Sequence, residues 1–496
     1  MTDAYFIFTP TGKTEGHIMD GKNQTIKNSK QIMIIMAGVM LGLFLAALDG
    51  TIVSTVMPII ASDLNGMQYY TWPFAVYMLT STVSVVIFGK CSDQFGRKGI
   101  FIFGIGVFIA GSVLCGISTG IIWLILARGL QGIGGGILTS LAFIIVAGLF
   151  PIYERGKYMG ILASVFGVAS VAGPVMGGFI AEALGWRWTF FINLPLGLAA
   201  ALIIHSALPE TTDAKSSHEV DCKGIACFTG GMVPLFIAVS CGGTVFDWTS
   251  VQVTGMLAIS LILIALFIRI ERRAANPIIP LHFFRKSVFT YTAAAAFTVS
   301  AIMSAGTIYL PLFMQDVQKI GAGASGLVIT PMVLALVAAS TAAGRLISST
   351  RRYKPVAVGG FATVGAGALM LSTLNPASPL AFIVAASILL GLGIGTMYPA
   401  LVIAAQTTVS VTDIGAVISL QQFFRNMGST LLTPVFGFIM YEGLGPQPDK
   451  NSLSLLPPEI MSHAIQLVFI SCILLAAAAM VLMLRLEDVP LKSKGC

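Results

Sequence analysis

The chain has 496 residues, of which 56% are hydrophobic and only 10% are charged, and its mean hydropathy is +0.89. A soluble domain carries about 25% charged residues, so this composition excludes a water-soluble fold and predicts a polytopic membrane protein. The formal net charge of +7 does not require nucleic acid, because the positions of the basic residues explain it.

Fourteen segments are long and apolar enough to cross a bilayer, which takes about 20 residues each. Their approximate limits are 32–58, 70–89, 99–118, 121–149, 158–182, 188–208, 224–243, 252–269, 288–313, 323–344, 355–374, 379–407, 413–441 and 463–485. An even number of spans places both termini on one side. Lys and Arg favour cytosolic segments, and the outer segments hold only Arg187, Lys319 and Lys450 if the termini are cytosolic. We therefore expect a plasma-membrane protein with both termini in the cytosol.

Two polar stretches near the middle of the chain, 209–223 and 270–287, divide the spans. They predict a cytosolic tail over 1–31, a six-helix bundle over 32–208 and a linker with an inserted two-helix hairpin over 209–287. A second six-helix bundle follows over 288–485, and a cytosolic tail over 486–496.

Asp49 lies deep in the first predicted span. A carboxylate at the centre of a membrane helix costs about 2.5–3.5 kcal/mol on insertion scales, and such residues usually serve a function. No other acidic residue is predicted to lie as deep.

The segment that follows the second span reads GKCSDQFGRK over 89–98. On its own it is an ordinary short cytosolic loop. It resembles the loop signature of the major facilitator superfamily, although Cys91 and Gln94 stand where the family prefers Leu and Arg. The resemblance implies a conformational latch that uses the charges of Asp93 and Arg97. Its members are Gly89, Asp93, Gly96, Arg97 and Lys98.

Arg128 lies in the fourth span, in a string RGLQG over 128–132 that resembles a second motif of the same family. An arginine there needs a partner or a watery cavity. At about 1.5 Å per residue, Arg128 and Asp49 lie at similar depths, so they could pair. The alternative is that Arg128 only braces the backbone.

Glycines mark the fifth span, where Gly173 and Gly177 are four residues apart and allow close helix packing, while Pro174 can bend the helix. Ordinary packing is the simple interpretation. The string GPVMGG over 173–178 resembles the antiporter motif of drug exporters, which symporters generally lack. The motif residues are Gly167, Gly173, Pro174, Gly177 and Gly178.

The strings LDGTIV over 48–53 and GWRWTFFINLPLG over 185–197 complete a resemblance to the drug:proton antiporter branch with fourteen membrane helices. It covers nearly the whole chain. It implies an all-α major facilitator fold, in which two six-helix bundles flank two extra central helices, and it implies no cofactor.

The second half carries a few polar residues within its apolar spans. Gln421 and Arg425 are four residues apart and share a helix face, which either lines a central cavity or braces the bundle. Methionine repacks around varied shapes, although in a span it more often serves packing alone. The candidate cavity residues are Gln131, Met397, Tyr398, Gln421, Gln422, Arg425 and Met427.

These features predict a proton-coupled exporter of lipophilic small molecules. Burial favours the neutral form of a carboxylate, so Asp49 could take a proton from outside as substrate leaves and release it inside, with Arg128 favouring the charged form. No nucleotide-binding domain for ATP is visible. With one deep carboxylate, we expect neutral or monocationic substrates.

Three alternatives remain. A dedicated exporter of one metabolite, antibiotic, lipid or siderophore would carry the same motifs. A proton-coupled uptake carrier is disfavoured by the antiporter motif. A membrane enzyme or channel is disfavoured because all five histidines lie at or outside span ends, which leaves no intramembrane metal or acid–base cluster. We therefore expect no enzyme activity and no metal.

Overall fold

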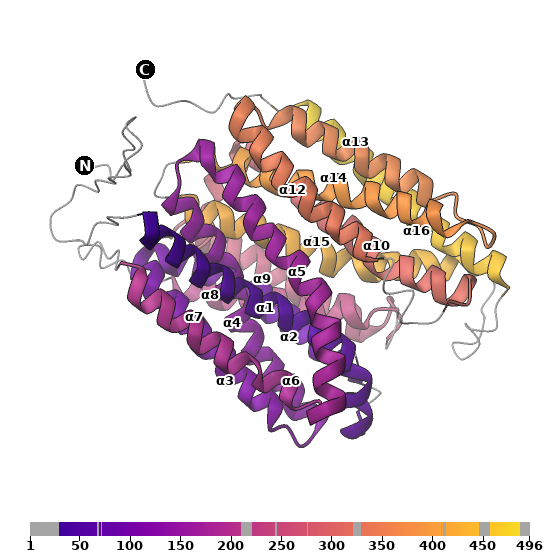
Figure 1. Ribbon diagram of the computed structural model, residues 1–496, viewed down its shortest axis with the longest axis horizontal. Coiled ribbons are helices and arrows are strands. Elements are labelled where there is room, and N and C mark those ends of the chain that lie inside the picture. Colours follow the sequence, from indigo (N-terminus) through magenta and orange to yellow (C-terminus); the bar gives the residue numbers. More distant parts are fainter. Residues whose placement is uncertain are drawn as a thin grey trace.

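The chain folds into a bundle of long helices, seen in a computed structural model (Figure 1). The structure describes residues 29–66, 69–70, 72–209, 221–243, 246–274, 276–320, 329–407, 409, 413–445 and 457–486. The predicted tails therefore lie almost entirely outside the described residues, as does most of the stretch 209–223. Within the described part, the β-structure is one isolated bridge between Gly242 and Phe246.

The helices follow the predicted spans closely. Thirteen described helical segments are long and apolar enough to cross a membrane, with α6 and α7 counted as one, and the more polar α15 lies among them. In chain order the helices are α1 (Ser29–Asp63), α2 (Trp72–Phe95), α3 (Arg97–Gly116), α4 (Ile121–Leu149), α5 (Ile152–Leu184), α6 (Trp188–Phe191), α7 (Asn193–Ala207), α8 (Cys222–Cys241), α9 (Val251–Glu271), the 3-10 helix η2 (Leu281–Arg285), α10 (Ser287–Leu312), the π-helical turn η3 (Phe313–Val317), α12 (Ile329–Thr350), α13 (Lys354–Leu371), α14 (Leu380–Gln406), α15 (Ile414–Gly443) and α16 (Pro458–Leu484).

One sequence prediction is wrong in detail. The segment 89–98 is not a loop, because α2 continues through its polar residues to Phe95 and α3 begins at Arg97. Only Gly96 separates the two helices. Its φ of 90° lies in the region that glycine adopts without steric cost, so the chain reverses there in a single residue.

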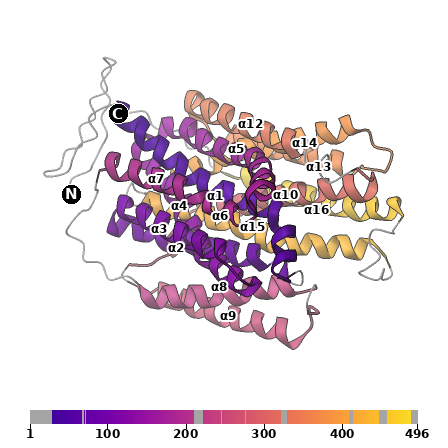
Figure 2. The same cartoon turned by 60° about the horizontal axis from the view of Figure 1, so that its bottom comes forward.

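Two halves make up the bundle. One apolar core joins α1, α3, α4, α5 and α7, and a second joins α10 and α12 to α16. The pair α8–α9 lies against one side, where α8 contacts both α2 and α15 (Figure 2). The inserted pair therefore contacts both halves of the molecule.

The halves meet on the side where the described chain begins and ends, which we call the terminal side. There α2 packs on α15 and α5 packs on α12. The approach is close: a Cβ at Gly89 would lie 2.6 Å from the Cβ of Ser419, and one at Gly344 would lie 2.0 Å from the carbonyl oxygen of Gly156. Toward the opposite, far side the ribbons of the halves diverge (Figure 1).

Candidate functional site: a buried ion pair and a cavity between the halves

Asp49 on α1 forms an ion pair with Arg128 on α4. The Nη1 atom of Arg128 donates a hydrogen bond to Oδ2 of Asp49 at 2.5 Å, and the two side chains are 0–1% exposed. The structure therefore contains the pair of Asp49 and Arg128 that their similar depth in the membrane allowed. Both residues belong to the first half, so the pair links two helices of that half and does not bridge the halves.

The second carboxylate oxygen of Asp49 accepts two further hydrogen bonds. Gln131 donates from Nε2 at 2.7 Å, and Asn193 donates from Nδ2 at 3.1 Å. Ser112 accepts from the same two amides and donates to the carbonyl of Phe190 at 2.9 Å. We call Asp49, Ser112, Arg128, Gln131 and Asn193 the Asp49 network, and it joins α1, α3, α4 and α7.

Every hydrogen-bond contact to the carboxylate oxygens of Asp49 comes from a donor. Hydrogen bonds to a charged group are worth about 1.5–3 kcal/mol each. The guanidinium of Arg128 also lies over the ring of Tyr77 on α2, with Cζ 4.2 Å from the centroid. Protonating Asp49 would remove the charge that compensates Arg128, and an uncompensated buried charge is strongly destabilising. A change of protonation here therefore stresses the packing of four helices.

Sequence reasoning placed Gln131 in the substrate cavity, but the structure buries it fully in the Asp49 network. It gave no role to Ser112, Asn193 or Tyr77. The sequence signal that could have identified Ser112 and Asn193 is a polar side chain inside an apolar span. Asn193 also belongs to the string over 185–197. That signal is weak because neutral polar residues are common in membrane helices.

The predicted latch residues lie where the halves meet on the terminal side. A Cβ at Gly415, in the first turn of α15, would lie 2.5 Å from both carboxylate oxygens of Asp93. Arg97 lies with Nη2 3.8 Å from Oδ1 of Asp93, and Lys98 follows it in the first turn of α3. Asp93 thus reaches from the first half to the second.

A further polar contact crosses the same interface. Arg155 on α5 donates from Nη1 to Oε1 of Gln406 on α14 at 2.7 Å, and from Nε to the carbonyl of Phe150 at 2.9 Å. Sequence reasoning gave Arg155 no role of its own. Its side chain is buried, so this bond helps to hold the terminal side closed.

The glycines of the predicted antiporter motif contact two different partners of α5. Gly173 and Gly177 face Thr51 and Ile52 on α1, two and three residues after Asp49. Thr51 donates to the carbonyl of Ala169 at 3.0 Å. Gly167 faces Val337 on α12 of the other half. Pro174 lies within α5, and Gly178 has open space beside it. The motif therefore packs α5 between the helix of Asp49 and the second half.

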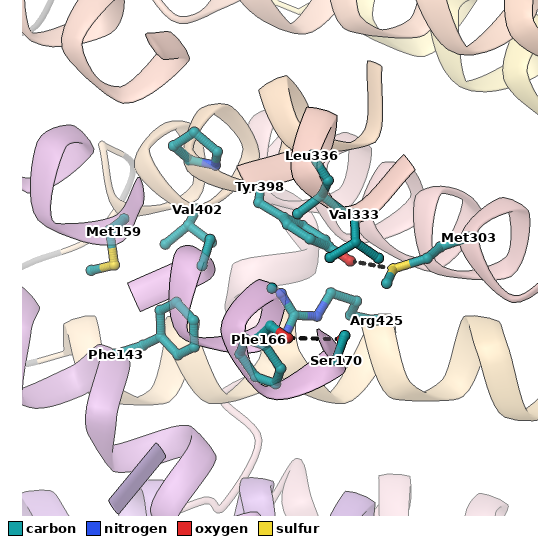
Figure 3. A pocket seen from close by; sticks show the side chains of 13 residues that line it. Phe143, Met159, Phe166, Ser170, Met303, Val333, Leu336, Tyr398, Val402 and Arg425 are labelled. Carbon is teal, nitrogen blue, oxygen red and sulfur yellow. Dashed lines mark hydrogen bonds between the residues drawn. The ribbon is translucent and has the colours of Figure 1, made fainter. Parts of the chain in front are cut away.

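A cavity of about 180 Å³ lies between the halves (Figure 3). Its lining is mainly apolar, and the guanidinium of Arg425 lies over the ring of Tyr398. A smaller adjoining cavity shares Tyr398, Val402 and Arg425 with it and is also lined by Gln421 and Gln422. The larger cavity is lined by Phe143, Met159, Ala163, Phe166, Gly167, Ser170, Met303, Val333, Leu336, Tyr398, Pro399, Val402 and Arg425.

Met397 and Met427 do not line either cavity, contrary to the sequence prediction. Met397 is fully buried, with its sulfur 2.5 Å from the position that a Cβ on Gly360 would take. Met427 is packed with an apolar cluster that includes Phe423. Each residue along a helix turns by about 100°. Met397 therefore points away from the cavity that its neighbour Tyr398 faces.

Comparison with known proteins places this architecture. The model of a family described as Major Facilitator Superfamily matches residues 39–433. Multidrug transporter protein MdtP of Bacillus subtilis (strain 168) is 37% identical over 444 residues, which cover 89% of this chain and 82% of that protein. Multidrug resistance protein 3 of the same organism is 32% identical over 407 residues, covering 82% and 79%.

Among solved structures, the proton:xylose symporter XylE bound to 6-bromo-6-deoxy-D-glucose superposes with a TM-score of 0.65 and 14% identity, covering 94% of this chain and 98% of that one. At this identity the likeness concerns the fold alone.

Proposed function

The chain belongs to the major facilitator superfamily of membrane transporters, and from this premise we propose that it exports lipophilic compounds across the plasma membrane in exchange for protons. The names of its relatives, a multidrug transporter and a multidrug resistance protein, support export of toxic compounds. The buried pair of Asp49 and Arg128 is the observation that carries the proton coupling, because it provides one titratable carboxylate inside the membrane domain.

Alternating access between the two halves is the proposed mechanism. The contacts of α2 with α15 and of α5 with α12 close the terminal side, while the ribbons diverge on the far side (Figure 1). This arrangement fits a conformation that faces the far side. Two contacts would act as latches that release when the terminal side opens. One is the packing of Asp93 on α2 against the first turn of α15, and the other is the hydrogen bond from Arg155 to Gln406.

Protonation of Asp49 would reach the interface through α5. The path starts at Asp49, continues to Thr51, which packs on Gly173, and ends at Gly167, which packs on Val337 of the other half. Neutralising Asp49 frees Arg128 and loosens the four helices that the network joins. A membrane potential contributes about 2.3 kcal/mol per charge per 100 mV to inward proton movement.

We also propose that the terminal side faces the cytosol. Exposed basic residues gather there, as the positive-inside rule requires. They include Arg269, Arg272 and Arg273 at the end of α9, and Arg351 and Arg352 after α12.

The test measures proton exchange in inside-out vesicles from a host that lacks its own drug pumps, with a pH-sensitive fluorescent dye inside. Vesicles with the wild-type protein should release protons when a transported compound is added outside, and the pH reporter inside should record the loss. Asp49→Asn keeps the size of the side chain but cannot ionise, and should abolish the exchange. Asp63→Asn is the matched control, because Asp63 pairs with Arg187 at an exposed position. Normal exchange by Asp49→Asn would overturn the proposal.

A further inference from the structure

Arg425 is a cation in the cavity without an acidic partner among the described residues. Its Cζ lies 4.7 Å from the ring centroid of Tyr398 and 6.0 Å from that of Phe143. The three ion pairs among the described residues involve other arginines. Neither cavity has an aspartate or a glutamate in its described lining. The charge that faces the cavity is therefore positive.

A second donor lines the smaller cavity together with Arg425, and this cavity has a volume of about 10 Å³. Gln422 is 3% exposed, and its Nε2 atom has no hydrogen-bond partner among the described residues. A buried donor without an acceptor is costly, so this amide is suited to a ligand acceptor. Its neighbour Gln421 donates from Nε2 to Thr292 at 2.9 Å, and its Oε1 atom is a buried acceptor without a partner among the described residues.

Tyr398 contributes a third donor at the point where the two cavities join. Its hydroxyl donates to the sulfur of Met303 at 2.9 Å (Figure 3), and a thioether is a weak acceptor. A charged oxygen from a ligand would compete well for this hydroxyl. Donors from Arg425, Gln422 and Tyr398 thus surround one region, next to an apolar cavity of about 180 Å³.

Asp49 does not offset this positive charge. Its carboxylate is fully occupied by Arg128, Gln131 and Asn193 within the first half, and it lines neither cavity. A cationic substrate would therefore meet Arg425 without a carboxylate to balance it. A guanidinium binds a carboxylate through two parallel hydrogen bonds, which supplies the partner that Arg425 lacks.

We propose that the substrates of this transporter are lipophilic anions, whose carboxylate or related acidic group binds Arg425, Gln422 and Tyr398 while the apolar body fills the larger cavity. This inference rests on the proposed export function and deepens it. It replaces the expectation of neutral or monocationic substrates, which took Asp49 as the charge that faces the substrate.

The test compares three probes that share one fluorescent body and differ only in charge: pyrenebutyrate, its methyl ester and the corresponding trimethylammonium compound. Binding to the full chain in lipid nanodiscs is measured by fluorescence anisotropy without any proton gradient, with empty nanodiscs as the background. Wild type should bind the acid at least about tenfold more tightly than the ester or the cation, which is the scale of one good charged pair.

Variants then locate the preference. Arg425→Gln should bring the affinity for the acid down to that for the ester and leave the ester unchanged. Arg425→Lys should keep part of the preference, and Gln422→Leu should reduce it. The matched control is Arg187→Gln, which removes an arginine from an exposed ion pair outside the cavity and should change nothing.

Binding of the cation by wild type as tight as that of the acid would overturn the anion site. An undiminished acid preference in both Arg425→Gln and Gln422→Leu would overturn it as well. The absence of binding for all three probes would also count against it. Because the assay has no gradient, these results are independent of proton exchange, which the Asp49→Asn variant tests. The anion site and the antiport proposal can therefore fail separately.

Discussion

Replacing Gly89 by alanine should shift the balance between the two conformations of the transporter. In this structure a Cβ on Gly89 would lie 1.8 Å from Oγ and 2.6 Å from Cβ of Ser419 on α15. Rotating the hydroxyl away does not relieve the second contact, so α2 and α15 must separate. The added methyl group therefore disfavours only the conformation in which the terminal side is closed.

The magnitude follows from the cost of overpacking, which is about 1–3 kcal/mol for an extra group in a packed interior. A conformation in which α2 and α15 are apart does not bear this cost. The ratio of the closed to the open terminal side should therefore fall about 5- to 150-fold.

Distances between spin labels would measure the ratio. Ile59 on α1 and Ile308 on α10 are exposed near the far-side ends of the two halves, and labels there should move closer together when the far side closes. In a cysteine-free background, Gly89→Ala should transfer population from the long to the short distance. The matched control is Gly106→Ala on α3, where nothing lies within 4 Å of the added Cβ.

The double variant Gly89→Ala with Ser419→Gly should restore the wild-type distribution, because it removes both contacting atoms and leaves Oγ of Ser140 as the nearest at 3.3 Å. The reasoning is refuted if Gly89→Ala behaves like Gly106→Ala. It is also refuted if the double variant keeps the shifted distribution, since the effect then has another origin.

Two further predictions concern thermal stability in detergent. Arg128→Met leaves Asp49 buried without its counter-ion and should cost about 3–5 kcal/mol, whereas adding Asp49→Asn in the same chain should recover most of the loss; a double variant as unstable as the single one would contradict this reading. Gly173→Ala places a Cβ 2.0 Å from the hydroxyl of Thr51 and should cost about 1–3 kcal/mol, while Gly178→Ala, which meets nothing within 4 Å, should be close to neutral; equal melting temperatures for the two would argue against close packing of α1 on α5.

The spans were predictable because apolar runs of bilayer length have no soluble alternative. Their ends were less so, since a helix does not stop where its apolar run stops. In α2 the polar residues from Lys90 to Gln94 continue the helix, and Gly96 alone connects α2 to α3. The presence of Gly96 suggests a turn, but it does not reveal that the turn consists of this one residue.

The partner of Asp49 was partly predictable for a simple reason. A charged residue inside a membrane is rare, so comparing the depths of Asp49 and Arg128 was enough to suggest their pairing. Ser112 and Asn193 could not be found in this way. Their contacts depend on how far α3 and α7 are rotated about their own axes, and a neutral polar residue in an apolar span leaves that rotation open. The prediction that Met397 lines the cavity was wrong for the same reason. A shift of one position along α14 moves a side chain from the cavity to the packed interior.

The helix pair α8–α9 makes the two seams between the halves unequal. It contacts α2 and α15 along one seam, and it leaves the seam of α5 with α12 uncovered. We expect a compound dissolved in the lipid to reach the interior along the seam of α5 with α12, where the described residues place no additional helix pair. The inserted pair therefore gives the molecule two unlike flanks within the plane of the bilayer.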